Sequence, residues 1–291
     1  MGYVSTGILG GAEGYAYRHG NFSADLKKGG INDVQLTPFP GGSQPVLQAL
    51  VGGSIDVGFL GNTSFLTAKA NGQDIVLLNE TLVGLDLWVI SRPGGPKTLR
   101  QLDNAKIAIP FGDIQERVGK EIEERAGLKH VQWVNVPPTG QADALANGAA
   151  DAAVVIARGS WSRLLTRGYP VVTKVSQTFP DLVGASVTVT TPQFLRRHPG
   201  FADAYEKARA NAVRLAQKQE DAYNTFQAEE FREGKVTAEE EAVYYPASRF
   251  QTKPFTEKGL TLLRKELNWL IDHGIAKSRF DLDKALATYK S

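Results

Sequence analysis

The chain has 291 residues, of which 42% are hydrophobic and 22% are charged, so it is long enough for two α/β lobes with cores of their own. Its 33 Lys and Arg nearly balance its 31 Asp and Glu, which argues against a nucleic-acid binder, because such proteins carry a clustered basic stripe. It contains no cysteine, which excludes disulfides, thiolate metal sites and a cysteine nucleophile, and which suits an exported protein whose free thiols would be exposed to oxidation.

Strands and helices alternate up to about residue 200, the pattern typical of parallel α/β architecture. The chain opens almost directly on a strand at Met1-Gly2-Tyr3, and we expect that an export signal has been removed ahead of this point. No apolar run approaches the roughly 20 residues that a membrane-spanning helix needs. The further strands that we predict, in chain order, are Val34–Phe39, Ile55–Leu60, Ile75–Asn79, Leu85–Ile90, Lys106–Ile109, Val131–Val136, Ala152–Ile156, Val171–Thr173 and Ser186–Thr191.

Capping residues mark the starts of the predicted helices, and glycine or asparagine marks their ends. The starts that we predict are Ser43 with Pro45 in the first turn, Asn62 or Thr63, Asp113 with Glu116 three residues later, and Thr191 before Pro192. Beyond about residue 200 we predict two long helices, Phe201–Gln219 and Thr256–His273. The second carries a stripe of leucines on one face, which we interpret as core.

Two stretches of the chain share one local pattern. Residues Ala49–Gly58 and Ala144–Ala153 each predict the last turn of a helix, a glycine stop, a short turn with Asp56 or Asp151, and a buried strand. A proline-containing loop and a hydroxyl residue precede each stretch. Two similar α/β units predict two similar lobes with a cleft between them, and the cleft is where we expect the functional site.

The turn-rich segment Ser91–Pro96 follows a predicted strand and is the strongest candidate for a crossover between lobes. A matching return lies near Asp181–Ala185. We therefore predict a discontinuous first lobe of residues 1–88 and 186–291, a second lobe of residues 92–183, and crossovers near 89–95 and 181–186.

The order and spacing of several motifs along the whole chain resemble those of the periplasmic sulfonate-, taurine- and nitrate-binding proteins of ABC importers. The motifs are Phe39–Pro45, Ala49–Gly58, Gly61-Asn62, Ala68, Gly72, Leu102-Asp103, Lys106–Ala108, Val136–Pro138, Ala142–Ala153 and Lys253–Thr256. The resemblance implies a type-II periplasmic-binding-protein fold, in which two α/β lobes joined by a hinge close on a small solute. It also implies a periplasmic monomer without cofactor or metal, which delivers a small organic anion or zwitterion to the transmembrane subunits of an ABC permease.

In open α/β sheets, ligands lie beyond the carboxyl ends of the strands and against helix N-termini, where free N–H groups favour anions. Glycine allows a close approach of the backbone, and hydroxyl and amide side chains add donors. The resemblance adds the loop after the first strand. The predicted ligand-binding residues are Ser5, Thr6 and Gly7; Gly42, Ser43 and Gln44; Gly61, Asn62 and Thr63; Phe111, Gly112 and Asp113; and Arg158. Taken singly, Ser43, Asn62 and Asp113 fit plain helix caps equally well.

Two segments depart from the sulfonate-binding pattern. Where that pattern has a Trp-rich strand end and an Asp-Pro, this chain has Arg158, which either binds an anion bidentately or forms a solvated or interlobe ion pair. Where it has a Gly-Ser-Ser-like helix start, this chain has Asp113, which would repel an anion but accept an amine or a hydroxyl. The ligand is therefore either a simple anion or a zwitterion.

Two other classes of protein remain as alternatives. The resemblance extends to enzymes on the same fold, a desulfinase and a thiamine-pyrimidine synthase, whose chemistry depends on cysteine or on clusters of cysteine and histidine. This chain has no cysteine, and its His19, His130, His198 and His273 show no metal-ligand spacing, so we expect a binding protein and no enzyme. A sensor input domain ranks lower, because no DNA-binding or membrane-spanning segment accompanies the lobes.

Overall fold

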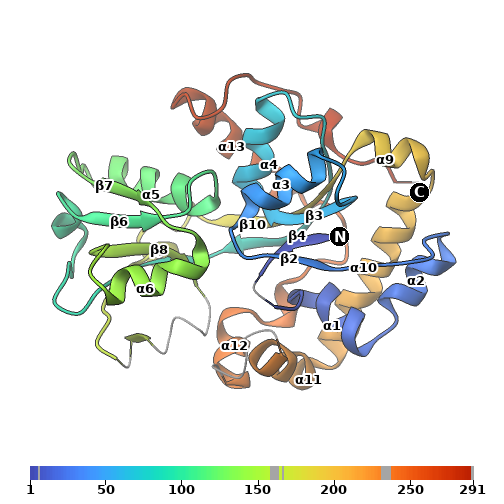
Figure 1. Ribbon diagram of the computed structural model, residues 1–291, viewed down its shortest axis with the longest axis horizontal. Helices are drawn as coiled ribbons and strands as arrows, with labels where there is room; N and C mark the ends of the chain where they lie inside the picture. Colours follow the sequence, from blue (N-terminus) through green and yellow to red (C-terminus); the bar gives the residue numbers. More distant parts are fainter. Residues whose placement is uncertain (6, 158–163, 166, 231–236, 290–291) are drawn as a thin grey trace.

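The computed structural model describes residues 1–291 except 6, 158–163, 166, 231–236 and 290–291. Its strands form two five-stranded sheets, and each sheet is the centre of one lobe (Figure 1). The two-lobed α/β architecture predicted from the sequence is confirmed. Among the described residues, no helix has both the length and the apolar character needed to cross a membrane.

The sheet of the first lobe contains β1 (Gly2–Val4), β2 (Thr37–Phe39), β3 (Val57–Gly61), β4 (Val76–Leu85) and β10 (Gly184–Thr190). The strand order is β2-β1-β3-β10-β4. β1 pairs in parallel with β2 and β3, whereas β10 pairs antiparallel with β3 and β4.

The sheet of the second lobe contains β5 (Leu87–Ser91), β6 (Lys106–Ile109), β7 (Gln132–Asn135), β8 (Ala152–Ile156) and β9 (Val171–Lys174). The strand order is β7-β6-β8-β5-β9, with β6 parallel to β7 and β8 and with β5 antiparallel to β8 and β9. The sheets are therefore mixed, where the sequence predicts parallel ones. In the first sheet, β10 pairs antiparallel with its neighbours, and it is the strand by which the chain returns from the second lobe. In the second sheet, β5 has this place, and it is the strand by which the chain arrives from the first lobe.

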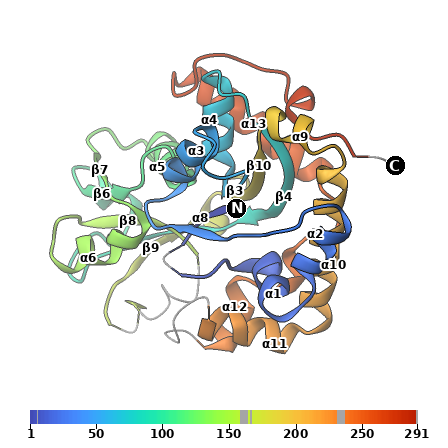
Figure 2. The ribbon, with the colours of Figure 1, turned by 45° about the vertical axis from the view of Figure 1, so that its right-hand side comes forward.

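Helices of the first lobe cover both faces of its sheet. On one side lie α3 (Ser43–Val51), α4 (Asn62–Ala70) and α13 (Glu257–Asp272), which share one apolar core with the sheet. On the other side lie α1 (Gly11–His19), α2 (Phe22–Lys28) and α10 (Phe201–Lys218), which share a second core (Figure 2). Further helical segments of this lobe are α9 (Pro192–Arg197), α11 (Glu220–Thr225), the π-helix η3 (Phe226–Glu230), α12 (Ala238–Tyr244) and the short 3-10 helices η4 (Ala247–Arg249) and η5 (Asp283–Ala285).

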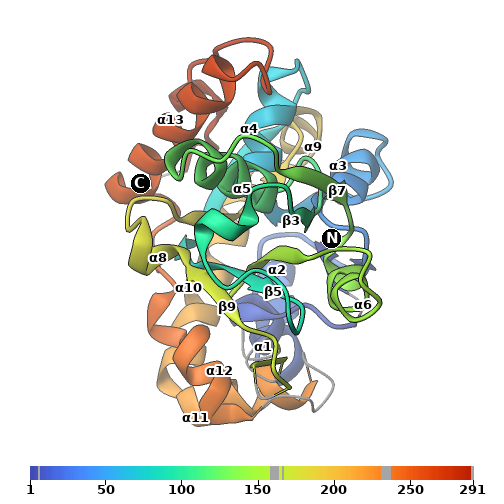
Figure 3. The same cartoon turned by 90° about the vertical axis from the view of Figure 1, so that its left-hand side faces the viewer.

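The second lobe is smaller, with α5 (Ile114–Arg125) and α6 (Gln141–Ala146) as its main helices and the short α8 (Val175–Thr178) near its end (Figure 3). Leu87 and Val89 of β5 point toward α5, whereas Trp88 and Ile90 point toward α6. This alternation follows from the two-residue period of a strand, and it places the two helices on opposite faces of the sheet.

The repeated sequence pattern forms a repeated structural unit. The carbonyl of Ala49 accepts a hydrogen bond from Ile55 N at 3.3 Å, and the carbonyl of Ala144 accepts one from Ala150 N at 3.0 Å. Each unit has a glycine in the turn between this carbonyl and this amide. Gly53 and Gly148 have φ values of 75° and 76°, a conformation that glycine adopts without strain. The units connect α3 to β3 in the first lobe and α6 to β8 in the second.

The chain passes from β4 of the first sheet to β5 of the second at Asp86, whose carboxylate accepts a hydrogen bond from Ser176 N at 2.8 Å. The predicted strand Leu85–Ile90 is therefore two strands on different sheets, and residues 87–88 lie in the second sheet. Gly84, with a φ of 87°, and Asp86 are turn residues at this point, but each stands singly between apolar residues, so the apolar pattern continues across the crossover. The predicted crossover Ser91–Pro96 instead contains a turn that follows β5.

The predicted helix caps are only partly correct. Thr191 accepts a hydrogen bond from Phe194 N at 3.1 Å, as expected of a cap. Ser43 and Asn62 are the first residues of their helices and make no capping bond, because their side chains bind other elements. Asp113 occupies the cap position of α5 without a capping hydrogen bond, and its carboxyl group instead binds Ser43 and Ser64 of the other lobe.

Candidate functional site

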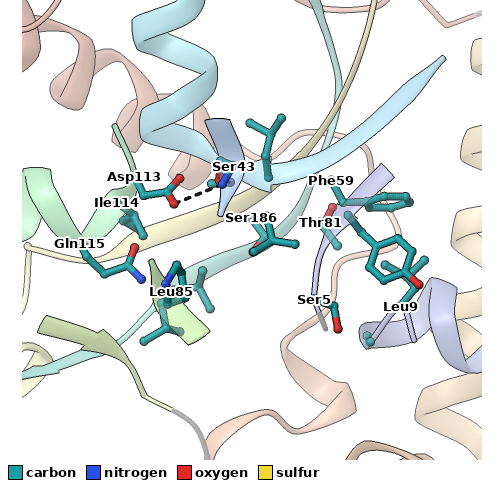
Figure 4. A pocket seen from close by; sticks show the side chains of 18 of the residues that line it. Ser5, Leu9, Ser43, Phe59, Thr81, Leu85, Asp113, Ile114, Gln115 and Ser186 are labelled. Atoms are coloured by element: carbon teal, nitrogen blue, oxygen red, sulfur yellow. Dashed lines mark hydrogen bonds between the residues drawn. The ribbon is translucent and has the colours of Figure 1, made fainter. Parts of the chain in front are cut away.

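A cavity of about 430 Å³ lies between the two lobes. The first lobe lines it with the ends of β1 and β3 and the start of α1, and the second lobe lines it with the starts of α5 and α6 (Figure 4). In both lobes these are the carboxyl ends of strands and the helix starts beyond them, where α/β sheets bind ligands. The cavity is therefore the candidate functional site.

The cavity wall is mainly apolar, with side chains from both lobes. Apolar lining residues include Leu9, Phe59, Leu85, Ile114, Ile156 and Phe250. Two carboxyl groups, Glu13 and Asp113, line it as well, whereas no Lys, Arg or His is found among the lining residues that the structure describes. Within the same described part of the chain, no three His, Asp or Glu residues are placed to hold a metal ion.

Asp113, at the start of α5, reaches across to the first lobe (Figure 4). Its Oδ2 accepts a hydrogen bond from Ser43 N, in the first turn of α3, at 3.2 Å, and its Oδ1 accepts one from the Ser64 hydroxyl at 2.8 Å. Burial raises the pKa of the Asp113 carboxyl, and the hydrogen bonds from Ser43 and Ser64 oppose this shift. The N-terminus of α3, a predicted anion site, thus already faces a carboxyl group of the protein.

Two glycines permit this approach of the lobes. Gly42 has a φ of 94°, and a side chain there would place its Cβ 2.6 Å from Asp113 Oδ2. Opposite, the carbonyl of Gly112 accepts hydrogen bonds from Gln44 Nε2 at 3.2 Å and from the Ser64 hydroxyl at 2.6 Å. We call this set, Gly42, Ser43, Gln44 and Ser64 of the first lobe with Gly112 and Asp113 of the second, the interlobe latch.

The predicted ligand-binding residues fall into three groups in the structure. Those that line the cavity are Ser5, Ser43, Gly61 and Asp113, and those that join the lobes beside it are Gly42, Gln44 and Gly112. The others do not line it: Gly7 and Phe111 are exposed, and Asn62 and Thr63 are buried elsewhere. Thr6 and Arg158 lie outside the described residues.

Asn62 and Thr63 point toward Glu266 of α13 and away from the cavity. The Glu266 carboxylate accepts hydrogen bonds from Asn62 Nδ2 at 2.7 Å and from the Thr63 hydroxyl, and it forms an ion pair with Arg117 of α5 at 3.0 Å. Arg117 also donates to the carbonyl of Val183, next to β10, at 2.6 Å. These residues therefore join the two lobes near the second crossover.

Glu13, in the first turn of α1, is an acidic lining residue that is not among those predicted from the sequence. Its side chain is buried, and its Oε1 has no hydrogen-bond partner among the described residues. Burial raises the pKa of the Glu13 carboxyl, while the positive charge of Arg209 opposes the shift. A signal was present, because Glu13 lies within the glycine-rich segment Gly7–Gly14, where an acidic residue marks a helix start.

Comparison with solved structures supports the fold. The periplasmic aliphatic sulphonate-binding protein SsuA from Escherichia coli is 20% identical, with a TM-score of 0.71 over 99% of this chain and 91% of that chain. The alkanesulfonate-binding protein SsuA from Xanthomonas axonopodis pv. citri, bound to MOPS, is 15% identical, with a TM-score of 0.78 over 99% and 97%. The desulfurization enzyme DSZB is 16% identical, with a TM-score of 0.68 over 98% and 95%.

These likenesses confirm the predicted periplasmic-binding-protein fold, which DSZB shows is shared by binding proteins and an enzyme. No curated protein sequence matches the chain. The sequence model of the NMT1/THI5-like family matches residues 27–222, which is well over half of the chain. The chain therefore belongs to the NMT1/THI5-like family.

Proposed function

We propose that the chain is the solute-binding component of an ABC importer, a periplasmic monomer that closes its lobes on a small solute and delivers it to a permease. The observation that carries this proposal is the cavity of about 430 Å³, which is lined by strand ends and helix starts of both lobes. Contacts from both lobes form only when the lobes are together, so the solute favours the closed state.

The proposed moving bodies are the two predicted lobes, residues 1–88 with 186–291 and residues 92–183, except that residues 87–88 move with the second sheet, to which β5 belongs. Between the two sheets the chain passes once at Asp86 and once between α8 and β10. Two connections between separate sheets are what a hinge requires.

For the solute we propose a sulfonate-like anion or a zwitterion, with taurine and nitrate among the candidates. Two of the similar structures are named as binders of aliphatic sulphonates or alkanesulfonates. The proposed contacts from this chain are the predicted ones at Ser5, Ser43 and Gly61, with Arg158 as the partner of an anionic group.

An enzymatic function is the second candidate, because the desulfurization enzyme DSZB shares the fold. The absence of cysteine argues against chemistry that needs a thiolate nucleophile. A binding protein stabilised by its solute without converting it fits the chain better.

The test combines binding, turnover and shape. Purified protein is mixed with a panel of sulfonates, taurine, nitrate and small organic amines, and melting temperature, product formation and the radius of gyration from small-angle scattering are recorded. We expect at least one solute to raise the melting temperature and to reduce the radius of gyration, without product. Turnover of a sulfonate or sulfinate would favour the enzyme, and a panel without any binder would refute solute binding.

Arg158→Ala tests the proposed anion contact. If Arg158 binds an anionic group in the closed protein, its removal should weaken the binding of a sulfonate by roughly 2–5 kcal/mol, the loss typical of a desolvated charge pair. Calorimetric titration of wild type and variant measures this. A dissociation constant changed by less than about twofold would show that Arg158 does not contribute to sulfonate binding.

A further inference from the structure

Glu13 is a buried acidic residue at the cavity whose hydrogen bonding is incomplete. The residue is only 2% exposed, it lines the cavity, and its Oε1 has no hydrogen-bond partner among the residues that the structure describes. A buried polar atom without a partner costs free energy, so such an atom at a cavity wall indicates a ligand group that completes it.

Arg209 does not supply the missing partner. Its Nε and Nη2 donate to Glu206, Nε at 2.8 Å and Nη2 at 2.5 Å, and its Nη1 and Nη2 donate to the carbonyls of Gln251 and Lys253 at 2.7 and 2.9 Å. All three nitrogens of the guanidinium group are therefore engaged within the first lobe. Its charge acts on Glu13 only over a distance.

Two helix starts beside the cavity, those of α1 and α3, already have acceptors of the protein. In α1, Gly11 N donates to the side-chain oxygen of Gln227 at 3.0 Å, and in α3, Ser43 N donates to Asp113 at 3.2 Å. At these two helix starts, a solute with only an anionic group would have to displace the acceptor or lie beside the carboxyl group of Glu13 or Asp113. A solute with N–H donors meets no such obstacle.

We propose, resting on the solute-binding function above, that the solute carries a cationic nitrogen, an ammonium or amidinium group, and that Glu13 is the residue that selects it. The N–H group donates to Glu13 Oε1, and the opposite charges compensate each other inside the cavity. The body of the solute packs against apolar lining residues such as Leu9, Phe59 and Phe250. The solute is thus an organic amine or amidine, and where it also carries an anionic group it is a zwitterion.

The test uses two matched sets of probes in calorimetric titrations of the full chain. One set is taurine and ethanesulfonate, which differ by an ammonium group, and the other is benzamidine and benzenesulfonate, which present opposite charges on the same ring. For wild type we expect the nitrogen-bearing member of at least one set to bind about tenfold more tightly than its partner. This comparison needs no variant and is independent of any effect of mutation on folding.

The variant Glu13→Gln, which keeps the shape and removes the charge, should lose about tenfold or more in affinity for that probe. Glu80→Gln is the matched control, because Glu80 is equally buried at 2%, has an Oε1 without a partner among the described residues, and does not line the cavity. The control should bind the probe as wild type does.

The inference is overturned if no nitrogen-bearing probe binds, if the sulfonates without nitrogen bind at least as tightly, or if Glu13→Gln and Glu80→Gln bind alike. The proposed function is tested by different outcomes. A sulfonate without nitrogen that binds and reduces the radius of gyration would leave solute binding intact and refute only the role of Glu13. Failure of the entire broader panel would refute solute binding itself.

Discussion

At the scale of single residues, side chains that the sequence predicts as caps or ligand contacts are used to join separate elements. The hydroxyl of Ser43 accepts a hydrogen bond from Gly61 N at 3.2 Å and so ties the start of α3 to the end of β3. The carboxyl group of Asp113 binds α3 of the opposite lobe, and Asn62 binds Glu266 of α13. Ser43, which lines the cavity, therefore has a structural role in addition to its proposed binding role, and a substitution can separate the two.

Ser43→Ala should lower the free energy of unfolding by about 1 kcal/mol, because Gly61 N loses its hydroxyl acceptor. If the hydroxyl also meets the solute, affinity should fall by a further amount of about 1 kcal/mol. Urea denaturation and calorimetric titration measure the two effects separately. Reduced stability with unchanged affinity would leave Ser43 with a structural role alone.

Glu80→Gln should change how stability depends on pH. Burial raises the pKa of Glu80 above its ordinary value of 4.5, although Thr256 donates two hydrogen bonds to its Oε2, at 3.1 and 3.2 Å. As pH rises through this window, the unfolded chain releases a proton that the folded protein retains, so the free energy of unfolding of wild type falls. Glu80→Gln has no carboxyl group at this position, so its free energy of unfolding does not fall for this reason.

We therefore expect the stability of wild type, measured by urea denaturation between about pH 4 and pH 7, to decline relative to that of Glu80→Gln. Parallel pH profiles would show that Glu80 has the same pKa in both states.

At the scale of elements, the repeated unit of helix, glycine turn and strand builds corresponding parts of the two lobes. In both units a helix carbonyl near the stop accepts a hydrogen bond from the backbone N–H two residues before the strand, and a glycine with positive φ makes the turn possible. The same local sequence therefore gives the same local structure in different surroundings.

Gly53→Ala and Gly148→Ala should each lower the free energy of unfolding by about 1 kcal/mol, since alanine is strained at φ values of 75° and 76°. No atom lies within 4 Å of the added Cβ at either position among the described residues, so steric contact contributes nothing. Asparagine tolerates this conformation better, and Gly53→Asn and Gly148→Asn should recover part of the loss in denaturant titrations. Equal losses for alanine and asparagine would point to a cause other than backbone strain.

At the scale of the whole molecule, the lobes meet in polar regions of different character. One is the interlobe latch beside the cavity. Another is the buried group of Glu266 and Arg117 near the second crossover, which includes an ion pair of 3.0 Å. A more exposed set joins α13 to the second lobe through the ion pairs of Lys265 with Asp181 and of His273 with Glu124. The latch lies beside the cavity, so opening of the cavity requires its hydrogen bonds to separate. We therefore expect the latch to form only when the lobes are closed.

Gly42→Ala should hinder closure, because its Cβ would lie 2.6 Å from Asp113 Oδ2. We expect small-angle scattering to show a larger radius of gyration than for wild type, and we expect solute affinity to fall by about tenfold. Gly53→Ala is the control, since it introduces similar backbone strain where no atom is within 4 Å. Identical scattering curves and affinities for the two variants would show that the latch does not govern closure.

The sequence by itself determined the features that depend on neighbouring residues. The strands Lys106–Ile109 and Ala152–Ile156 have the predicted bounds, because each is a short apolar run between turn residues. The long helices begin and end within one or two residues of the predicted positions, and Thr191 caps α9 as expected. Two similar local units were sufficient to predict two lobes.

Only the tertiary structure decided which elements these side chains meet. Asn62 and Glu266 are 204 residues apart in the chain, so no local pattern could show that the amide points away from the cavity. At Asp86 the chain leaves one sheet and enters the other, although the apolar pattern of the strands continues. What changes there is the set of strands to which the backbone is hydrogen-bonded, and the side chains of β4 and β5 do not reveal that change. Glu13 differs from an ordinary acidic residue of a first helical turn only by its burial at the cavity, and burial arises when distant elements pack together.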